Sequence, residues 1–337
     1  MIGIEMNSIN STLNITQPVQ RNYSIDSLKF VCAILVVFIH CSYPYKEYLL
    51  PITDVAVPLF FCISGYFVSG VKRKWNRISR IAKILLWSSI LYLVKTELFW
   101  LFSKQEFYIP TWKNIFDFII FNDMSFSIHL WYLSAYIYVL IIAYFIDRYG
   151  VWKYSMCIIF PLLLVGVCIK YQIRDICPHD IQYYRNAYFN GLPFFLLGAV
   201  VKKSPPPFFY NMLVIKNIHV ISTLLIIFLF MVRYLLTAEN FMNLLLREVN
   251  LVLLTYIIVF MVVKSGQSND NILSKLGRDY SLYIYIFHVL VMQVIELSVA
   301  YLQGPLYNIF MLVNPFVVVL FSIVLTLVLG KFKLINV

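Results

Sequence analysis

Two histidines stand inside long apolar stretches of this sequence, where an ionisable side chain is costly unless it faces a protein interior or water. His40 closes the stretch IDSLKFVCAILVVFIH, and His288 lies within GRDYSLYIYIFHVLV. Histidine is the side chain best matched to proton transfer near neutral pH. Either histidine alone is equally well explained as a satisfied packing residue, but two of them together favour a site for acid–base chemistry.

Helix geometry places these histidines relative to the polar residues before them. Lys29 and His40 lie on one face of a helix, within about 20° of each other and about 16 Å apart along its axis. If Lys29 is at the cytoplasmic boundary, His40 is near the midplane of a hydrocarbon core of about 30 Å. His288 lies about 12 Å beyond Tyr280. We therefore expect both histidines at comparable depth, with the His40 end of the first span bordering a wet cavity.

The remaining histidines are weaker signals. His129 begins the run HLWYLSAY and faces the same compartment as the long outer loops, so a site role and a packing role both stay open. For His179 and His219 we expect solvated or interfacial positions.

Composition identifies the solvent around these residues. Of 337 residues, 61% are apolar and 13% charged, whereas soluble domains are about half apolar and a quarter charged. The net charge of +11 does not indicate nucleic-acid binding, because Lys and Arg lie in short loops between apolar runs. The six cysteines lack the spacing of a zinc site or disulfide framework, so we expect small hydrophobic residues and no metal.

The apolar runs have the length of membrane-spanning helices. They predict an all-α, polytopic helix bundle with about ten transmembrane helices. The expected spans are residues 25–43, 52–70, 78–102, 129–147, 154–170, 186–201, 213–236, 243–263, 280–302 and 306–330.

The basic loops predict the orientation, because short cytoplasmic loops collect Lys and Arg. The segment VKRKWNRISRIAK after the second span favours an N-in/C-in arrangement. Residues 1–22 are then expected to be a polar cytoplasmic tail, 23–332 a single membrane domain and 333–337 a short cytoplasmic C-terminus. Two longer outer segments, 103–128 and 170–186, are expected to carry function or to fold back onto the domain.

Arg77 and Arg80 lie where the third span leaves the cytoplasm. Guanidinium groups there are suited to bind an anionic cofactor. A role as topology determinants explains them equally well.

At these residues the sequence resembles the acyltransferase 3 family of bacterial integral-membrane acyltransferases. The resemblance covers roughly residues 23–330, and its most specific element is the first span, with Asp26, Lys29 and His40. The further segments, in the family's order, are PLFFCISGYF (58–67), NRISRIAKIL (76–85), HLWYLSAYIY (129–138), YRNAYFNGLPFFLLGAVV (184–201) and SLYIYIFHVLV (281–291).

This resemblance implies transfer of an acyl group, commonly acetyl from acetyl-CoA on the cytoplasmic side, to a hydroxyl of an envelope glycan or glycolipid in the bacterial inner membrane. It implies His40 as the principal catalytic residue and His288 as a second one of less defined role. Lys29, Arg77 and Arg80 would bind the anionic donor. The candidates for supporting or acceptor-side roles are Asp26, His129, Trp131 and Arg185.

Two departures from the family pattern matter. The position that is most often Arg is Lys29, which keeps the charge but loses the bidentate fork for phosphate. In the segment HLWYLSAYIY, the residues that follow Trp131 include Ser134-Ala135-Tyr136. One large branch of the family has a Glu there, which this sequence lacks.

The residues leave alternatives open. His40 acts either as a general base toward the acceptor hydroxyl or as the carrier of a transient acyl group. From another class, a secondary transporter or lipid-linked glycan flippase would use buried histidines for proton coupling, and a sensor would carry out no chemistry.

Overall fold

The computed structural model describes residues 21–67, 71–102, 109–177, 180–203, 218–236, 240–266, 269–299 and 304–331. Within these ranges the chain is helical and contains no strand. The main helices, in chain order, are α1 (Tyr23–His40), α2 (Lys46–Thr53), α3 (Ala56–Tyr66), α4 (Val71–Phe102), α5 (Trp112–Phe121), α6 (Trp131–Arg148), α7 (Trp152–Ser155), α8 (Ile159–Ile173), α9 (Leu192–Lys203), α11 (Ile218–Leu235), α12 (Phe241–Ser265), α13 (Ile272–Val299) and α14 (Pro305–Lys331).

Short turns of other helix types connect several of these elements. They are the 3-10 turns η1 (Ile128–Leu130), η2 (Met156–Ile158) and η3 (Ile181–Tyr183), and the π-helix η4 (Ala187–Gly191), which leads directly into α9. The all-α expectation is confirmed for the described residues.

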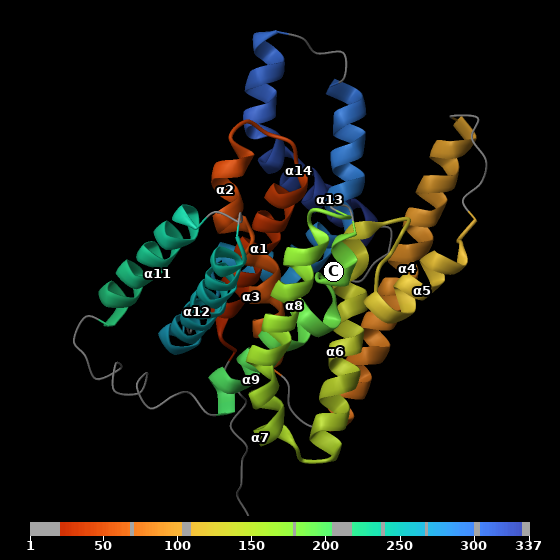
Figure 1. Cartoon of the computed structure of the whole chain (residues 1–337). Coiled ribbons are helices and arrows are strands. Elements are labelled where there is room, and N and C mark those ends of the chain that lie inside the picture. The colour runs from red at the N-terminus through yellow and green to blue at the C-terminus, as the bar shows by residue number, and fades with distance from the viewer. Residues whose placement is uncertain are drawn as a thin grey trace, which may run out of the picture.

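Eight helical segments in the described ranges are long and apolar enough to cross a membrane. They coincide with eight of the predicted spans: α1, α2–α3, η1–α6, α7–α8, α11, α12, α13 and α14. The predicted third and sixth spans fall on α4 and on η4–α9. The protein is therefore a multi-pass membrane protein, and the number ten stays a prediction. Figure 1 shows α4 and α5 on one side of the bundle and α11 on the other.

Several boundaries differ from those we predicted, each for a local reason. The span predicted for 280–302 begins earlier, at Ile272, because the Asn271 side chain accepts the backbone N–H of Ser274 at 2.8 Å and caps the helix. The span predicted for 52–70 is divided between α2 and α3 by a turn at 54–55. The basic segment before residue 78 is the first part of α4, where Lys74 is buried and paired with Asp147 of α6.

The segments 103–128 and 170–186, which we expected on the outer side, fold back onto the domain where they are described. Tyr138 of α6 donates a hydrogen bond to the carbonyl of Ile119 in α5 at 2.9 Å. The Phe121 ring contacts the Tyr183 ring at 4.8 Å between centroids. The tails 1–20 and 332–337, and His179, lie outside the described residues.

The central contact joins α1 to α13, which run parallel near the middle of the bundle (Figure 1). At Gly277 a Cβ atom would lie 1.8 Å from the carbonyl oxygen of Asp26 and 3.1 Å from the backbone nitrogen of Phe30. Only a glycine permits this approach. In lipid, where apolar burial between helices gives little driving force, such backbone contact through small residues is a principal source of helix association.

The cysteines divide into two groups, all free. Cys32, Cys41 and Cys62 are buried in the helix core, as expected for small hydrophobic residues, whereas Cys157, Cys168 and Cys177 are exposed on the bundle surface.

We predict that Gly277→Val destabilises the protein by about 1–3 kcal/mol, because the added methyl groups overpack a backbone contact. The measurement is the thermal unfolding midpoint of the purified protein in detergent. Ser298→Ala, at an exposed position of the same helix, is the control and should change little. Equal midpoints for the two variants would contradict the importance of this contact.

Candidate active site

Three histidine rings meet in the interior of the bundle. His40 is the last residue of α1, His129 lies in η1 and His288 lies in α13. The ring centroids are 5.0 Å apart for His40 and His288, 5.3 Å for His129 and His288, and 6.5 Å for His40 and His129. Because α1 and α13 run parallel from the Gly277 contact, the similar depth expected for His40 and His288 becomes direct proximity.

The tautomer of neutral His288 follows from its surroundings. Its Nδ1 lies 2.8 Å from the carbonyl oxygen of Tyr285 and 3.1 Å from that of Ile284. A carbonyl only accepts hydrogen bonds, so Nδ1 carries the proton and Nε2 carries a lone pair. That Nε2 is buried and has no hydrogen-bond partner among the described residues.

His129 is fixed from three sides. Its Nδ1 lies 3.0 Å from the hydroxyl of Ser127, its ring packs against the Tyr92 ring at 4.6 Å, and its carbonyl accepts the hydroxyl of Tyr285. Its Nε2 is also buried, without a partner in the described part of the chain. Each unsatisfied buried polar group costs about 1–3 kcal/mol. Two of them beside His40 are better explained by a ligand site than by packing.

A cavity of ≈ 200 Å³ opens beside these rings. His40, His129, Tyr132 and Tyr285 form one part of its wall. The charged and aromatic residues of the remaining wall are Asp54, Trp131, Lys170, Tyr184, Arg185, Phe189, Arg233 and Glu248. A wet cavity at the His40 end of the first span is what the sequence led us to expect.

The far wall of this cavity is held by charge pairs. Arg233 is buried and donates to Asp54 at 3.1 Å, to the carbonyl of Pro51 at 3.1 Å and to that of Arg247 at 3.0 Å. Arg247 lies 3.6 Å from Asp54. These bonds connect α11 and α12 to the turn between α2 and α3. Sequence reasoning missed Arg233 and Asp54, although a charge inside each apolar run was the available signal.

A second pair lies on the same wall. Lys170 of α8 is 3.8 Å from Glu248 of α12, and its ammonium group lies 5.7 Å from the centre of the Tyr184 ring. Lys170 also escaped the sequence reasoning, because it closes an apolar run where a snorkelling lysine is ordinary.

Arg185 reaches the cavity from the segment between η3 and η4. Its guanidinium lies over the Trp131 ring, 5.3 Å from the centroid. Asn186 fixes this segment, accepting from the backbone N–H groups of Tyr188 at 3.0 Å and Phe189 at 3.1 Å. The buried Asn122 accepts the N–H of Ala187 at 2.7 Å, so the two outer segments hold each other beside the histidines.

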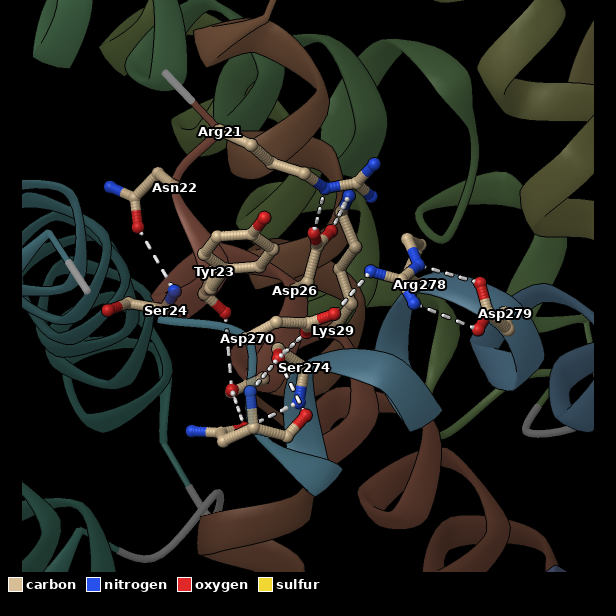
Figure 2. Close-up of polar contacts among 12 residues, drawn as sticks. Arg21, Asn22, Tyr23, Ser24, Asp26, Lys29, Asp270, Ser274, Arg278 and Asp279 are labelled. Carbon is tan, nitrogen blue, oxygen red and sulfur yellow. Dashed lines mark hydrogen bonds and ion pairs between the residues drawn. The ribbon is translucent and has the colours of Figure 1, made fainter. Parts of the chain in front are cut away.

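The other predicted site residues lie at the opposite end of α1. Asp26 lies between Arg21 at 2.7 Å and Lys29 at 2.9 Å, and Figure 2 shows the Arg278 pairs with Asp270 and Asp279 beside them. The ammonium group of Lys29 is 5.5 Å from the centre of the Phe67 ring. We call this group the Lys29 end of the bundle.

Arg77 and Arg80 lie on α4 toward the same end. Arg77 donates to the hydroxyl of Tyr136 at 3.4 Å, whereas Arg80 is exposed. The Tyr136 ring stacks on Tyr132, with centroids 6.1 Å apart, and Tyr132 lines the cavity. An aromatic path therefore links Arg77 to the histidines.

The structure thus separates the predicted residues into two groups. His40, His129, Trp131 and Arg185 line the cavity, and the His288 ring packs against the two histidines among them. Asp26, Lys29, Arg77 and Arg80 lie toward the Lys29 end, on the far side of the aromatic path.

Part of this chain is similar in sequence to bacterial amino-acid racemases. An amino-acid racemase of Enterococcus faecalis is 26% identical over 216 residues, which are 55% of this chain and 29% of the racemase. A serine/alanine racemase of Enterococcus gallinarum is 30% identical over 135 residues, 35% of this chain and 18% of the racemase. The chain spans less than a third of the length of these relatives. No solved structure shows significant similarity.

The family comparison is more extensive. The model of the acyltransferase 3 family, described as an acyltransferase domain, matches residues 22–330. This match covers α1 to α14 and both groups of residues described above, and it confirms the resemblance seen in the sequence. The chain therefore belongs to the acyltransferase 3 family.

Proposed function

We propose that this protein transfers an acetyl or other acyl group from acyl-CoA, bound on the cytoplasmic side, to a hydroxyl of an envelope glycan or glycolipid. The proposal places it in the bacterial inner membrane with both termini in the cytoplasm. The observation that carries it is the cluster of three histidines, two with unpartnered ring nitrogens, beside a polar cavity within a membrane acyltransferase.

In the proposed reaction, His40 acts as a general base. Its imidazole takes the proton of the acceptor hydroxyl while the hydroxyl oxygen attacks the thioester carbonyl. A carbon–oxygen bond forms, the carbon–sulfur bond breaks, and the departing thiolate receives the proton from His40. The products are the acyl ester and CoA with a free thiol.

The neighbouring histidines support this role through their lone pairs. The Nε2 atom of His288 is buried and unpartnered among the described residues, on a ring that two carbonyls hold and whose centroid is 5.0 Å from that of His40. A hydrogen bond from a ring N–H of His40 to the lone pair of this Nε2 would leave the other nitrogen of His40 free to accept the acceptor's proton. Such a bond also disperses the positive charge that His40 gains. The alternative, a transient acyl group on His40, uses the same nitrogen as nucleophile.

The donor would enter from the Lys29 end. CoA carries several phosphates, which Lys29, Arg77 and Arg80 would bind as charge-assisted partners. Lys29 and His40 are separated by about 16 Å along α1, a span that the extended pantetheine arm is long enough to cover. The Tyr136–Tyr132 path supplies an apolar wall for that arm.

We predict that His40→Ala lowers acyl transfer by at least about 10²-fold, the smaller end of general-base contributions. The measurement follows radiolabel from acetyl-CoA into the envelope glycan fraction of membranes. His219→Ala, an exposed histidine of α11, is the control and should retain the rate of the wild type. Equal incorporation by the wild type and His40→Ala would exclude the proposed base.

We predict that Lys29→Gln and Arg77→Gln each raise the KM for acetyl-CoA about tenfold with little change in kcat, because each loses a charged contact to phosphate. Lys153→Gln, at an exposed basic position of α7, should leave KM unchanged. If both variants lower kcat at unchanged KM, the donor phosphates bind elsewhere.

We predict that transfer depends on the sidedness of the membrane. Sealed inverted vesicles should use added acetyl-CoA at once, whereas sealed right-side-out vesicles should do so only after permeabilisation, because charged CoA does not cross the hydrocarbon core. The measurement is incorporation of label into either preparation. Immediate use by right-side-out vesicles would contradict a cytoplasmic donor site.

A further inference from the structure

Two arginines line the cavity, Arg185 and Arg233, and only Arg233 has a charged partner within bonding distance among the described residues. In the described residues the Arg185 guanidinium makes no hydrogen bond or ion pair, and it lies over the face of the Trp131 ring. Arg233, on the opposite wall, has a carboxylate and two carbonyls as acceptors. The Arg185 guanidinium is therefore available to bind a ligand, whereas hydrogen bonds within the protein already use the donors of Arg233.

Keeping a charged guanidinium at the buried position of Arg185 costs free energy. Burial lowers the pKa of its guanidinium, which means that the charged form is poorly solvated there. Asp123 is the acidic group that acts on it electrostatically, but no ion pair forms between them. Burial and the neighbouring Asp117 raise the pKa of Asp123, so its charged form is also disfavoured by its surroundings.

The segment that carries Arg185 is nevertheless held firmly. The Asn186 side chain caps η4 through two backbone N–H groups and donates to the carbonyls of Gln182 at 3.0 Å and Tyr183 at 3.1 Å. The stacking on Trp131 then restricts the plane of the guanidinium. A planar donor fork, fixed in this way and lacking an acceptor, is complementary to a carboxylate or a phosphate.

We propose that Arg185 binds an acidic group of the acceptor, a carboxylate or phosphate, close to the hydroxyl that is acylated. The small cavity brings Arg185, His40 and His129 to one space of ≈ 200 Å³, so the acidic group and the reacting hydroxyl belong to the same sugar-sized unit. The role of this unit as acceptor rests on the proposed function, but its binding does not.

A different role for Arg185 would be to stabilise the oxyanion formed from the thioester carbonyl. The two roles give different kinetics. An acceptor-binding arginine affects KM for acidic acceptors alone, whereas an oxyanion-binding arginine lowers kcat for all acceptors.

The first experiment measures binding without catalysis. Purified protein in detergent is titrated with methyl β-D-glucuronide, glucose 6-phosphate and the neutral methyl β-D-glucoside, followed by tryptophan fluorescence, which Trp131 reports from within the cavity. We expect at least one acidic probe to bind about tenfold more tightly than the neutral one, the value of one charged hydrogen bond. The relative affinity of the carboxylate and phosphate probes distinguishes the two sources of the acidic group.

The variants test whether this preference belongs to Arg185. Arg185→Gln should abolish the preference, and Arg185→Lys should retain part of it because the charge remains. Arg174→Gln, an arginine of the same outer segment that does not line the cavity, should preserve it. The proposal is overturned if all three probes bind equally or not at all to the wild type, or if Arg185→Gln keeps the preference.

The second experiment separates this inference from the proposed function. Acetyl transfer to the glucuronide and the glucoside is measured for the wild type and for Arg185→Lys, whose thermal midpoint verifies folding. A rise in KM for the glucuronide alone supports acceptor binding, whereas an equal fall in kcat for both acceptors overturns it in favour of the oxyanion role. Acidic-probe preference without any acyl transfer would sink the proposed function and leave the binding role of Arg185 intact.

Discussion

The parallel contact between α1 and α13 determines the geometry of the whole site. Lipid is as apolar as the helices themselves, so close backbone packing through small residues has to supply association energy that water would otherwise provide. Gly277 allows that packing beside Asp26. From this contact both helices rise in the same direction at the same pitch, and after a similar number of residues they deliver His40 and His288 to adjacent positions. One steric constraint therefore sets the depth of both rings.

The distribution of satisfied and unsatisfied polar groups then separates structure from function. Asp26 with Arg21 and Lys29, and Arg233 with Asp54, are pairs that complete one another. The first group lies at the start of α1 and the second joins α11 to the turn after α2, and both leave little capacity for a ligand, apart from the remaining donors of Lys29. The Nε2 atoms of His129 and His288 are buried at a cost that the fold does not offset. His129 and Arg185 line the same cavity, and His288 packs against the His40 and His129 rings beside it, which is why we place the chemistry there.

Sequence reasoning identified what depends on local patterns. Run lengths predicted the membrane helices, and the spacing of Lys29 and His40 predicted that one helix carries a basic group at one end and a histidine in a cavity at the other. It could not choose a role for His129, because its position depends on a 3-10 turn held by Tyr285, a residue far along the chain. The contacts of Arg233 in the cavity wall could not be predicted either, because Arg233 and its partner Pro51 are separated by 182 residues. Hydrophobic periodicity reports that a helix meets lipid, but it does not specify the neighbouring helix.

The two segments that meet at Asn122 and Ala187 position their part of the cavity wall in a different way from the membrane helices. His40 and His288 are carried by membrane helices, and their placement depends on backbone packing that tolerates little change. Arg185 instead comes from the segment between η3 and η4, whose position depends on side-chain hydrogen bonds of Asn186 and Asn122. The ring cluster and Arg185 are therefore held by different kinds of contact. A lineage could exchange one surface of the cavity for another while the ring cluster stays intact.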